Sequence, residues 1–540
     1  MEQIARELVT MVRTPLADSH VEMLRAAGTL QTWKAGETVL RQGQVMTHFL
    51  YLLEGEMEAL NFDGSRYGGG PTLGPTQFVG EISFMFNGGA LLKIRAIQDT
   101  TCIAVPRAKM LELMALVPEM SDIILTVFAA RRRAMIEREG SGVIVIGAEA
   151  DRAIGRVAVF LNRNRIPYKN LSLADADAFA VASGCGVSRP HPMVIFGEDK
   201  MVEDPTPRKL AQLLGIDREI EEDKTFDVVI VGGGPAGIAA GVYAGSEGLC
   251  ALVIEDMTVG GQAGTSSRIE NFMGFPTGIS GADLCWRGEI QAVKFGTRFA
   301  IPRRAVSLEQ LDDGTFCIGL RDGAKVGAKA VVVSTGVQYR RLNLDRLKAF
   351  EGAGVFYAAT DLEAKFCRNT EAIVIGGGNS AGQAAMYMSR AASHVHVLVR
   401  RTNLAASMST YLSQRLEQDP RITVHFQTEA VELCGEERLE RVVICNKASG
   451  EERTIHTQAM FIMIGAKPYT DWLSGLVALD ERGFVLTGAA AGGRSVFETS
   501  CHGIFAVGDV RAGSTKRVAS SVGEGSVVIS HVWSHVNGLE

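Results

Sequence analysis

Two glycine-rich turns carry the strongest chemical signal in this sequence. The first follows the apolar segment 226–231 and places Gly232, Gly234 and Gly237 in GxGxxG spacing at the start of an alanine-rich segment. In a strand–turn–helix unit, the first glycine permits a tight turn, the second lets the backbone approach a pyrophosphate, and the third lets helix and strand pack closely. Glu255 ends the next apolar segment, where a carboxylate can accept hydrogen bonds from ribose hydroxyls. We predict a dinucleotide site here, with a purely structural glycine turn as the alternative.

The second turn, within EAIVIGGGNSAGQAA, repeats this spacing with Gly376, Gly378 and Ala381. After the following apolar segment, Arg400 and Arg401 stand where the first unit has an acid. Two guanidinium groups can hold a ribose 2′-phosphate, which favours NADPH over NADH. A solvated basic turn is the alternative. Two such units in one chain predict a flavin and a nicotinamide that exchange a hydride.

The elements that position these turns follow from the pattern of the chain, whose 540 residues predict several domains. Short apolar segments between glycine turns in residues 1–138 indicate a β-barrel or jelly roll followed by a long helix. Residues 139–216 form a compact α/β unit, and the acidic segment 217–225 is the predicted linker. From residue 223 onward, strands, glycine turns and helices alternate as in two Rossmann-like three-layer domains.

Residues 223–540 resemble the low-molecular-weight thioredoxin reductases. The matching motifs, in chain order, are GGGPAG, GGQAGTSSRIENFMGFP, VVVSTGVQYRRL, GGGNSAGQAA, LVRR, MIGAKPYT and GIFAVGDVRAGSTKRVASSVGEG. The resemblance implies an NADPH-dependent flavoprotein oxidoreductase of the class II pyridine nucleotide-disulfide oxidoreductase family. It also implies an FAD-binding domain built from residues 223–344 and 468–540, an NADPH-binding domain of residues 345–467 inserted between them, and a homodimer.

The same resemblance implies further cofactor-binding residues within these motifs. Asp509 would hold the ribityl hydroxyls of the flavin. Arg517, Val518 and Ala519 would open the last helix, whose N-terminus favours negative charge on a reduced flavin. The other implied contacts are Pro235, Ala236, Gly261, Gln262, Asn271, Thr335, Gly336, Asn379, Ser380 and Gly508.

The segment VFYAATDLEAKFC departs from that family. Thioredoxin reductases read Cys-Ala-Thr-Cys-Asp here, whereas this chain has Ala358, Ala359, Thr360 and Asp361. Disulfide exchange needs a thiolate, so reduction of thioredoxin by this route is not expected. We keep Asp361 and the lone Cys367 as candidate catalytic residues. The electron acceptor is unknown: a small redox protein, a quinone and oxygen all remain open.

Two other functions remain open beside this oxidoreductase. One is a thioredoxin-disulfide reductase that uses an unconventional thiol. The other is a redox or nucleotide sensor that binds FAD and NADPH and transmits its conformation to a partner.

The N-terminal region resembles the cyclic-nucleotide-binding domain of catabolite-activator-type regulators, because its segment FVGE matches the start of their phosphate cassette. The resemblance implies that Gly80 and Glu81 bind the phosphate and ribose. Ala90 stands where those domains place a phosphate-binding arginine, and Lys93 or Arg95 could replace it. Loss of a charge-assisted partner weakens affinity by about 1.5–3 kcal/mol. A degenerate structural module and a true cyclic-nucleotide sensor both stay open, and DNA binding is disfavoured since no helix-turn-helix follows.

Residues 139–216 resemble a thioredoxin or glutaredoxin fold, although the position after GVIVIG reads AEADR and Cys185 is isolated. We expect a structural or docking role for this degenerate unit.

Composition limits the remaining classes. The net charge of −6 predicts no nucleic-acid partner, and no apolar run reaches the roughly 18 residues that span a bilayer. The nine cysteines form no CxxC and no metal-ligand cluster, so we expect neither a disulfide framework nor a bound metal. The amphipathic N-terminus does not read as a signal peptide, and we therefore expect a cytoplasmic protein with no membrane partner.

Overall fold

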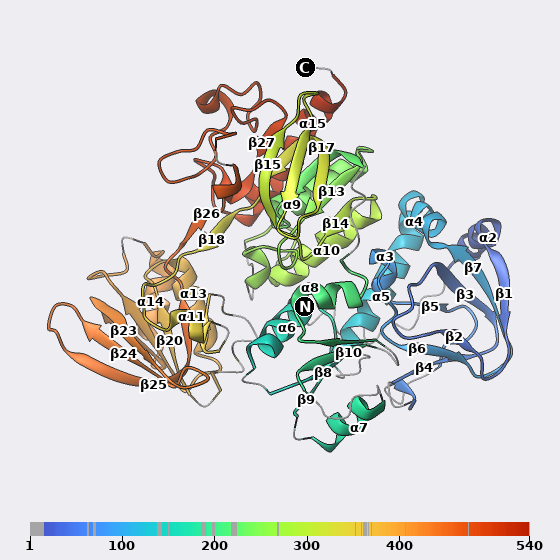
Figure 1. Cartoon of the computed structure of the whole chain (residues 1–540), viewed down its shortest axis with the longest axis horizontal. Helices are drawn as coiled ribbons and strands as arrows, with labels where there is room; N and C mark the ends of the chain where they lie inside the picture. Colours follow the sequence, from blue (N-terminus) through green and yellow to red (C-terminus); the bar gives the residue numbers. More distant parts are fainter. Residues whose placement is uncertain are drawn as a thin grey trace.

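The computed structural model describes residues 16–538 apart from short gaps, namely residues 62–63, 68–71, 138–142, 149–150, 174, 185–190, 197–199, 218–223, 267–268, 270, 352, 358, 360–363, 365–366, 369, 406 and 474. The chain folds into four domains, which Figure 1 shows as separate groups of helices and strands. We name them the barrel domain (16–137), the small α/β domain (143–217), the split domain (224–339 and 466–538) and the inserted domain (340–465).

The barrel domain consists of two antiparallel sheets, with strand orders β1-β7-β3-β5 and β2-β6-β4. Strand β3 is buried on both faces, and four phenylalanines fill the space between the sheets and helix α5: Phe49, Phe78, Phe84 and Phe128. The elements are α2 (Asp18–Ala27), β1 (Thr29–Trp33), β2 (Thr38–Leu40), β3 (His48–Glu54), β4 (Met57–Leu60), β5 (Phe78–Val79), α3 (Ser83–Phe86), β6 (Lys93–Ala96), β7 (Thr100–Pro106), α4 (Arg107–Leu116) and α5 (Pro118–Glu137).

The small α/β domain has one four-stranded sheet of order β11-β10-β8-β9, in which only β8 and β9 run parallel. Helix α6 begins where the Asp151 carboxylate accepts hydrogen bonds from the N–H groups of Ala153 and Ile154. Helices α6 and α8 cover one face of the sheet and α7 covers the other. The elements are β8 (Val143–Ile146), α6 (Arg152–Arg163), β9 (Lys169–Leu171), α7 (Ala176–Gly184), β10 (Met193–Phe196), β11 (Lys200–Glu203) and α8 (Pro207–Leu213).

The split domain is built on a sheet of order β14-β13-β12-β17-β16-β15, with β27 parallel to β17. The central strands are buried on both faces because α9 and α15 cover one side and the 3₁₀ helix η3 packs beside β15 on the other. The elements are β12 (Thr225–Val231), α9 (Pro235–Ser246), β13 (Ala251–Ile254), η2 (Ala263–Thr265), α10 (Gly281–Lys294), β14 (Arg298–Ala300), β15 (Ala305–Gln310), β16 (Phe316–Leu320), β17 (Lys325–Val333), β18 (Val337–Tyr339), β26 (Ala466–Pro468), η3 (Asp471–Leu473), η4 (Gly488–Ala491), β27 (Ile504–Ala506), η5 (Gly508–Val510) and α15 (Val518–Val536).

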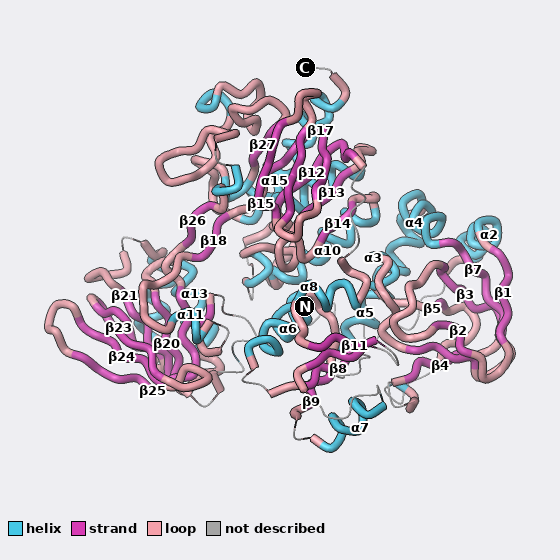
Figure 2. The backbone as a smooth tube through the Cα atoms, in the orientation of Figure 1, coloured by secondary structure: helices cyan, strands magenta, loops and turns pink. Residues whose placement is uncertain are grey.

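The inserted domain repeats this plan with a sheet of order β22-β21-β20-β25-β24-β23, and β19 pairs with β25. Its elements are α11 (Leu347–Phe350), β19 (Val355–Phe356), β20 (Glu371–Ile375), α13 (Asn379–Met388), β21 (His394–Val399), α14 (Thr410–Gln418), β22 (Ile422–Phe426), β23 (Thr428–Cys434), β24 (Arg441–Asn446) and β25 (Glu452–Ile462). The chain leaves and re-enters the split domain through the antiparallel pair β18 and β26, which Figure 2 shows as a narrow ribbon between the two domains.

Ion pairs connect the small α/β domain to its neighbours. Arg165 pairs with Asp283 of α10, and its guanidinium stacks on the Trp286 ring with 5.0 Å to the centroid. Arg303 Nε donates to the buried carboxylate of Asp217 over 2.6 Å. Arg208 of α8 also pairs with Asp322 over 2.6 Å, so these three contacts fix the small α/β domain against the split domain.

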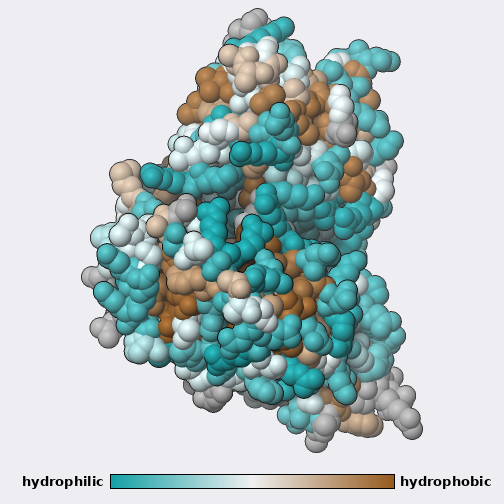
Figure 3. Space-filling model, turned by 90° about the vertical axis from the view of Figure 1, so that its left-hand side faces the viewer, coloured by the Kyte–Doolittle hydropathy of each residue, from teal (hydrophilic) through white to brown (hydrophobic). Residues whose placement is uncertain are grey.

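The molecular surface seen in Figure 3 is mostly hydrophilic, with separate smaller patches of apolar side chains. Among the described residues, no helix combines the length and the apolar character needed to cross a bilayer.

Candidate functional site

The first glycine turn lies between β12 and α9. Gly232 has a φ of +110°, and a Cβ there would clash with the carbonyl oxygen of Ser334, which directly follows the neighbouring strand β17. A Cβ on Gly237 would clash with the carbonyl oxygen of Gly232, so helix and turn are in close contact. A Cβ on Gly234, by contrast, meets no atom within 4 Å. The turn is therefore packed on its inner side and open on the side where a ligand would approach.

Glu255 follows β13 and faces this turn. Its Oε2 accepts a hydrogen bond from the Gly233 N–H over 2.8 Å, and its Oε1 accepts one from the Met257 N–H over 3.1 Å. Burial, together with the adjacent Asp256, raises the pKa of Glu255 to about 7, although the N–H donors act in the opposite direction. The backbone therefore holds this carboxylate at the mouth of the turn.

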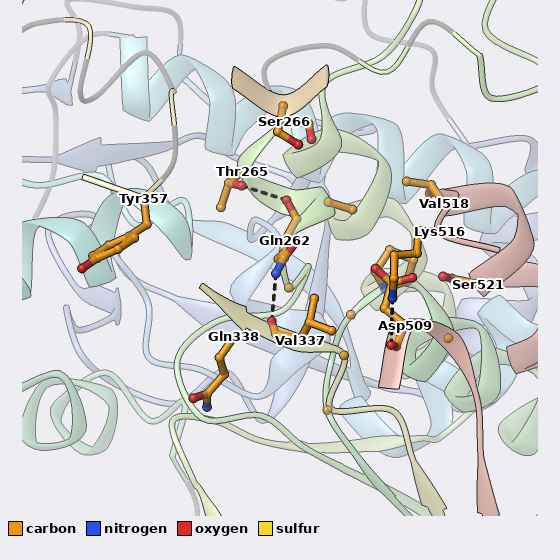
Figure 4. Close-up of a pocket in the computed structure, with 18 of the residues that line it drawn as sticks. Gln262, Thr265, Ser266, Val337, Gln338, Tyr357, Asp509, Lys516, Val518 and Ser521 are labelled. Atoms are coloured by element: carbon orange, nitrogen blue, oxygen red, sulfur yellow. Dashed lines mark hydrogen bonds between the residues drawn. The ribbon is translucent and has the colours of Figure 1, made fainter. Parts of the chain in front are cut away.

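A cavity of about 1660 Å³ opens in front of the first turn and extends to the inserted domain. Figure 4 shows part of its wall, where Gln262 Nε2 donates to the Val337 carbonyl over 2.8 Å. Most of the predicted cofactor-binding residues line it: Gly232, Gly234, Pro235, Ala236, Glu255, Gly261, Gln262, Thr335, Gly336, Asn379, Ser380, Gly508, Asp509, Arg517 and Val518. A single ligand pocket usually has about 300–1000 Å³, so this cavity has room for more than one large ligand.

Asp509 lies at the end of the cavity where β27 leads into α15. Burial raises the pKa of the Asp509 carboxyl, and no described residue donates a hydrogen bond to its carboxylate. Lys516 Nζ donates instead to the Asp509 carbonyl oxygen over 3.2 Å (Figure 4). The sequence did not single out Glu524, whose Oε2 accepts the Gly508 N–H over 2.6 Å and whose Oε1 accepts from Arg511 Nη2 over 2.7 Å. Glu524 thus holds the backbone that presents Asp509.

The second glycine turn lies between β20 and α13. Gly376 has a φ of +143°, and a Cβ there would clash with the carbonyl oxygen of Met463. Ala381, in the first turn of α13, is fully buried. Asn379 Oδ1 accepts the Ser409 N–H over 2.8 Å, and Asn379 and Ser380 line the cavity. Residues from the two glycine turns therefore face one space.

Several predicted residues lie outside this cavity wall. Arg400 and Arg401 are exposed after β21, and Asn271 and Ala519 are exposed on the split domain. Gly237, Gly376, Gly378 and Ala381 belong to the turns but do not line the cavity. Conversely, the cavity wall includes residues that the sequence did not indicate, among them Arg163, Tyr387, Arg390, Tyr411, Arg415 and Lys467. Lys467 lies within the motif MIGAKPYT, but the motif alone did not give it a role; the other five stand outside the motifs that the sequence analysis used.

The segment between β19 and β20 holds both candidate catalytic residues. Asp361 lies outside the described residues. Cys367 is fully buried in the core of the inserted domain, with its Sγ 3.7 Å from Met388 Sδ, and it lines neither large cavity. A substrate therefore has no access to this thiol in the described conformation.

The predicted effector cassette of the barrel domain is occupied by the chain itself. Arg132 of α5 donates to Glu81 Oε2 from Nε over 2.9 Å and from Nη2 over 2.6 Å. A Cβ on Gly80 would lie 3.2 Å from the Phe128 ring, so α5 also fills the space beside the cassette. Ala90 is buried.

Lys93 and Arg95, the two possible substitutes for the phosphate-binding arginine, both lie on β6. Arg95 Nε donates to Glu58 Oε1 over 3.0 Å, so its guanidinium already has a carboxylate partner.

Comparisons with known proteins agree with this arrangement. Residues 226–525 match the family described as pyridine nucleotide-disulphide oxidoreductase, and residues 30–116 match the cyclic nucleotide-binding domain. NADPH-dependent thioredoxin reductase 3 of Arabidopsis thaliana is 33% identical over 308 residues, which are 56% of each chain, so this chain spans about half of that relative. Thioredoxin reductase of Treponema pallidum is 33% identical over 315 residues, 58% of this chain and 98% of the relative.

Solved structures give the same result. Thioredoxin reductase of Lactococcus lactis, in the form named the FR conformation, has a TM-score of 0.53 and 28% identity, and 58% of this chain covers 100% of it. Thioredoxin reductase of T. acidophilum has a TM-score of 0.53 and 26% identity, with 59% of this chain covering 100% of it. The predicted relation to thioredoxin reductases, the N-terminal cyclic-nucleotide-binding domain and the multidomain architecture are thus confirmed. Thioredoxin reductases use FAD and NADPH, which are the two cofactors predicted from the glycine turns of this chain. The chain belongs to the pyridine nucleotide-disulphide oxidoreductase family.

Proposed function

We propose that this chain is an FAD-dependent NADPH oxidoreductase without a redox-active disulfide, which passes electrons from NADPH through FAD directly to an acceptor. One observation carries the proposal: residues of both glycine turns line a single cavity, while the thiol nearest to the expected disulfide position is sealed in the core. The acceptor belongs to one of three classes, a small redox protein, a quinone or oxygen.

The residues of the first site fit FAD. The open space at Gly234 leaves room for a pyrophosphate against the start of α9, and Glu255 stands where ribose hydroxyls would lie. The Asp509 carboxylate faces the cavity with acceptor atoms that no described residue uses, which suits a polyhydroxylated chain such as ribityl. The first turn of α15 directs backbone N–H groups toward the same region and favours negative charge there.

The residues of the second site fit NADPH. Asn379 and Ser380 open α13 and line the cavity, where the N–H groups of a helix start can bind phosphate. Arg400 and Arg401 are exposed after β21 and are available for a 2′-phosphate.

When bound, FAD supplies the redox chemistry by accepting a hydride from NADPH and giving electrons to the acceptor. The chain supplies position and electrostatics. Gln262 fixes the loop 260–262 against the Val337 carbonyl, and Glu524 fixes the backbone of Gly508. The cavity that spans both domains lets two bound dinucleotides approach each other, which hydride transfer requires.

Two alternatives were predicted beside this enzyme. A thioredoxin-disulfide reductase with an unconventional thiol would need Cys367 to reach solvent, although this side chain is fully buried beside Met388. A sensor that binds FAD and NADPH without turnover uses the same cavity, and only the electron-transfer assay separates it from an enzyme.

We further propose that the barrel domain is a degenerate effector module and that the protein is a homodimer. A cyclic nucleotide would have to displace Arg132 from Glu81 before it could use that carboxylate. The strand order β9-β8-β10-β11 with one parallel pair supports a thioredoxin-like fold for the small α/β domain, and its ion pairs with Asp283 and Arg303 support a docking role.

The test is an anaerobic titration of the purified yellow protein with NADPH, followed by a screen of quinones, oxygen and thioredoxin as oxidants. Bleaching of the flavin by NADPH and its reoxidation by an acceptor are the expected results. Flavin that NADPH cannot reduce would refute the enzyme. Loss of thioredoxin reduction in Cys367→Ser would support the unconventional thiol, and calorimetry with cAMP or cGMP tests the effector module.

A further inference from the structure

One residue of the cavity wall comes from outside the part of the chain that matches the oxidoreductase family. Arg163 ends helix α6 of the small α/β domain, whereas the family match covers residues 226–525. Its side chain nevertheless lines the cavity together with residues of the first glycine turn. The small α/β domain therefore contributes a cation to a site that its neighbour builds.

The contacts of Arg163 locate it at one end of this site. Arg163 Nη1 donates to Met257 Sδ over 3.5 Å. Met257 follows Glu255 by two residues, and its N–H group donates to the Glu255 carboxylate over 3.1 Å. In a dinucleotide fold, the acid after the second strand marks the adenosine ribose. Arg163 consequently stands beside the adenosine end of the site, away from Asp509.

Helix α6 is held in this position at both ends. At its start, Arg152 Nη2 donates to the Ala349 carbonyl oxygen of the inserted domain over 3.0 Å. Just past its end, Arg165 pairs with Asp283 and stacks on Trp286 of the split domain. An element fixed at two points presents its side chains in a defined direction, which reduces the entropy lost when a ligand binds.

The guanidinium of Arg163 has N–H donors that its contact with Met257 does not use. A thioether sulfur is a weak acceptor, and among the described residues no carboxylate lies within ion-pair distance of Arg163. A ribose oxygen or an adenine ring nitrogen is a better acceptor for the same donors.

We propose that Arg163 is a cofactor-binding residue that donates hydrogen bonds to the adenosine half of FAD, so that the flavin site is shared between the split domain and the small α/β domain. This inference rests on the proposed function, because it needs FAD in the cavity. It gives the small α/β domain a role that requires no cysteine. By linkage, bound FAD strengthens the docking of that domain as much as docking strengthens FAD binding.

The experiment compares four holoproteins: wild type, Arg163→Ala, Arg163→Met and the matched control Arg156→Ala. Arg156 is exposed on the same helix and lines neither large cavity. Each protein is diluted, and free flavin is measured by fluorescence after ultrafiltration, with ADP added as a competitor in a second series. We expect the dissociation constant for FAD to rise about tenfold in both Arg163 variants, since a charged donor is lost, and to stay unchanged in Arg156→Ala.

The outcomes separate the two claims. The constant for ADP, which carries the adenosine half without a flavin, should rise by the same factor. Wild-type affinity in Arg163→Ala overturns the inference. Wild-type affinity in Arg163→Met alone overturns the hydrogen-bond role, because methionine keeps the packing. Weakened FAD with unchanged ADP overturns the placement at the adenosine end. If the wild-type protein retains no FAD at all, the proposed function fails, whatever the residue at position 163.

Discussion

The buried ion pair between Arg132 and Glu81 is expected to hold helix α5 against the segment that contains Glu81. The two side chains are 8% and 6% exposed, and Arg132 makes two hydrogen bonds to the same carboxylate oxygen. Arg132 also donates to Ser83 Oγ over 2.7 Å and to the Arg165 carbonyl oxygen over 3.0 Å. Arg132→Met keeps most of the side-chain length but leaves a buried carboxylate without its cation. Removal of one partner of a buried pair costs about 3–5 kcal/mol, and the two further lost bonds favour the upper half of that range.

The assay is hydrogen–deuterium exchange of the full chain, read on peptides of α5, because local opening is measured without assuming two-state unfolding of several domains. A loss of about 3 kcal/mol should accelerate exchange by more than about 100-fold. The double variant E81Q/R132M should recover part of the protection, since no unpaired charge stays buried. Lys109→Met, which removes an exposed pair with Glu112, is the control and should cost at most about 1 kcal/mol.

Two results would contradict this reasoning. One is exchange of α5 in Arg132→Met within about fivefold of wild type, which corresponds to roughly 1 kcal/mol. The other is a double variant less protected than the single one, because then the buried carboxylate charge is not the source of the cost.

Three further changes test other parts of the molecule. Burial raises the pKa of the Glu289 carboxyl to about 8, so between about pH 4.5 and 8 the folded state keeps a proton that the unfolded state releases. The stability of the fold should therefore fall as the pH rises through this range, by at most about 1.4 kcal/mol per pH unit. Melting temperatures measured across this range should lose this pH dependence in Glu289→Gln and keep it in the exposed control Glu247→Gln. Replacing Arg400 and Arg401 together by alanine should lower kcat/KM for NADPH at least about tenfold and leave NADH unchanged, and an equal loss with both substrates would argue against 2′-phosphate binding. Cys367→Ser should leave steady-state NADPH oxidation within about twofold of wild type while lowering the melting temperature, because it places a hydroxyl in an apolar core.

The glycine turns could be predicted because all of their chemistry lies in neighbouring residues. The positive φ of Gly232 and Gly376 and the burial of the strands before them follow directly from spacing and apolar pattern. Contacts between residues that are far apart in the sequence could not be predicted in this way. Arg132 and Glu81 are 51 positions apart, and Arg415 reaches the cavity from a helix with no recognisable motif. Such pairs depend on how domains pack, and no local periodicity encodes that.

In the barrel domain and in the inserted domain, a side chain that the sequence marked as a binding or reacting group is held inside the protein. The Glu81 carboxylate, which we predicted to bind a nucleotide, is held by Arg132, and the Cys367 thiol is buried in an apolar core. Helix α6 of the small α/β domain instead places Arg163 in the wall of the large cavity. A domain that is fixed in position can alter the affinity of a neighbouring site without chemistry of its own. We therefore expect changes at the Arg165–Asp283 contact to alter FAD affinity without altering the acceptors that the flavin can reduce.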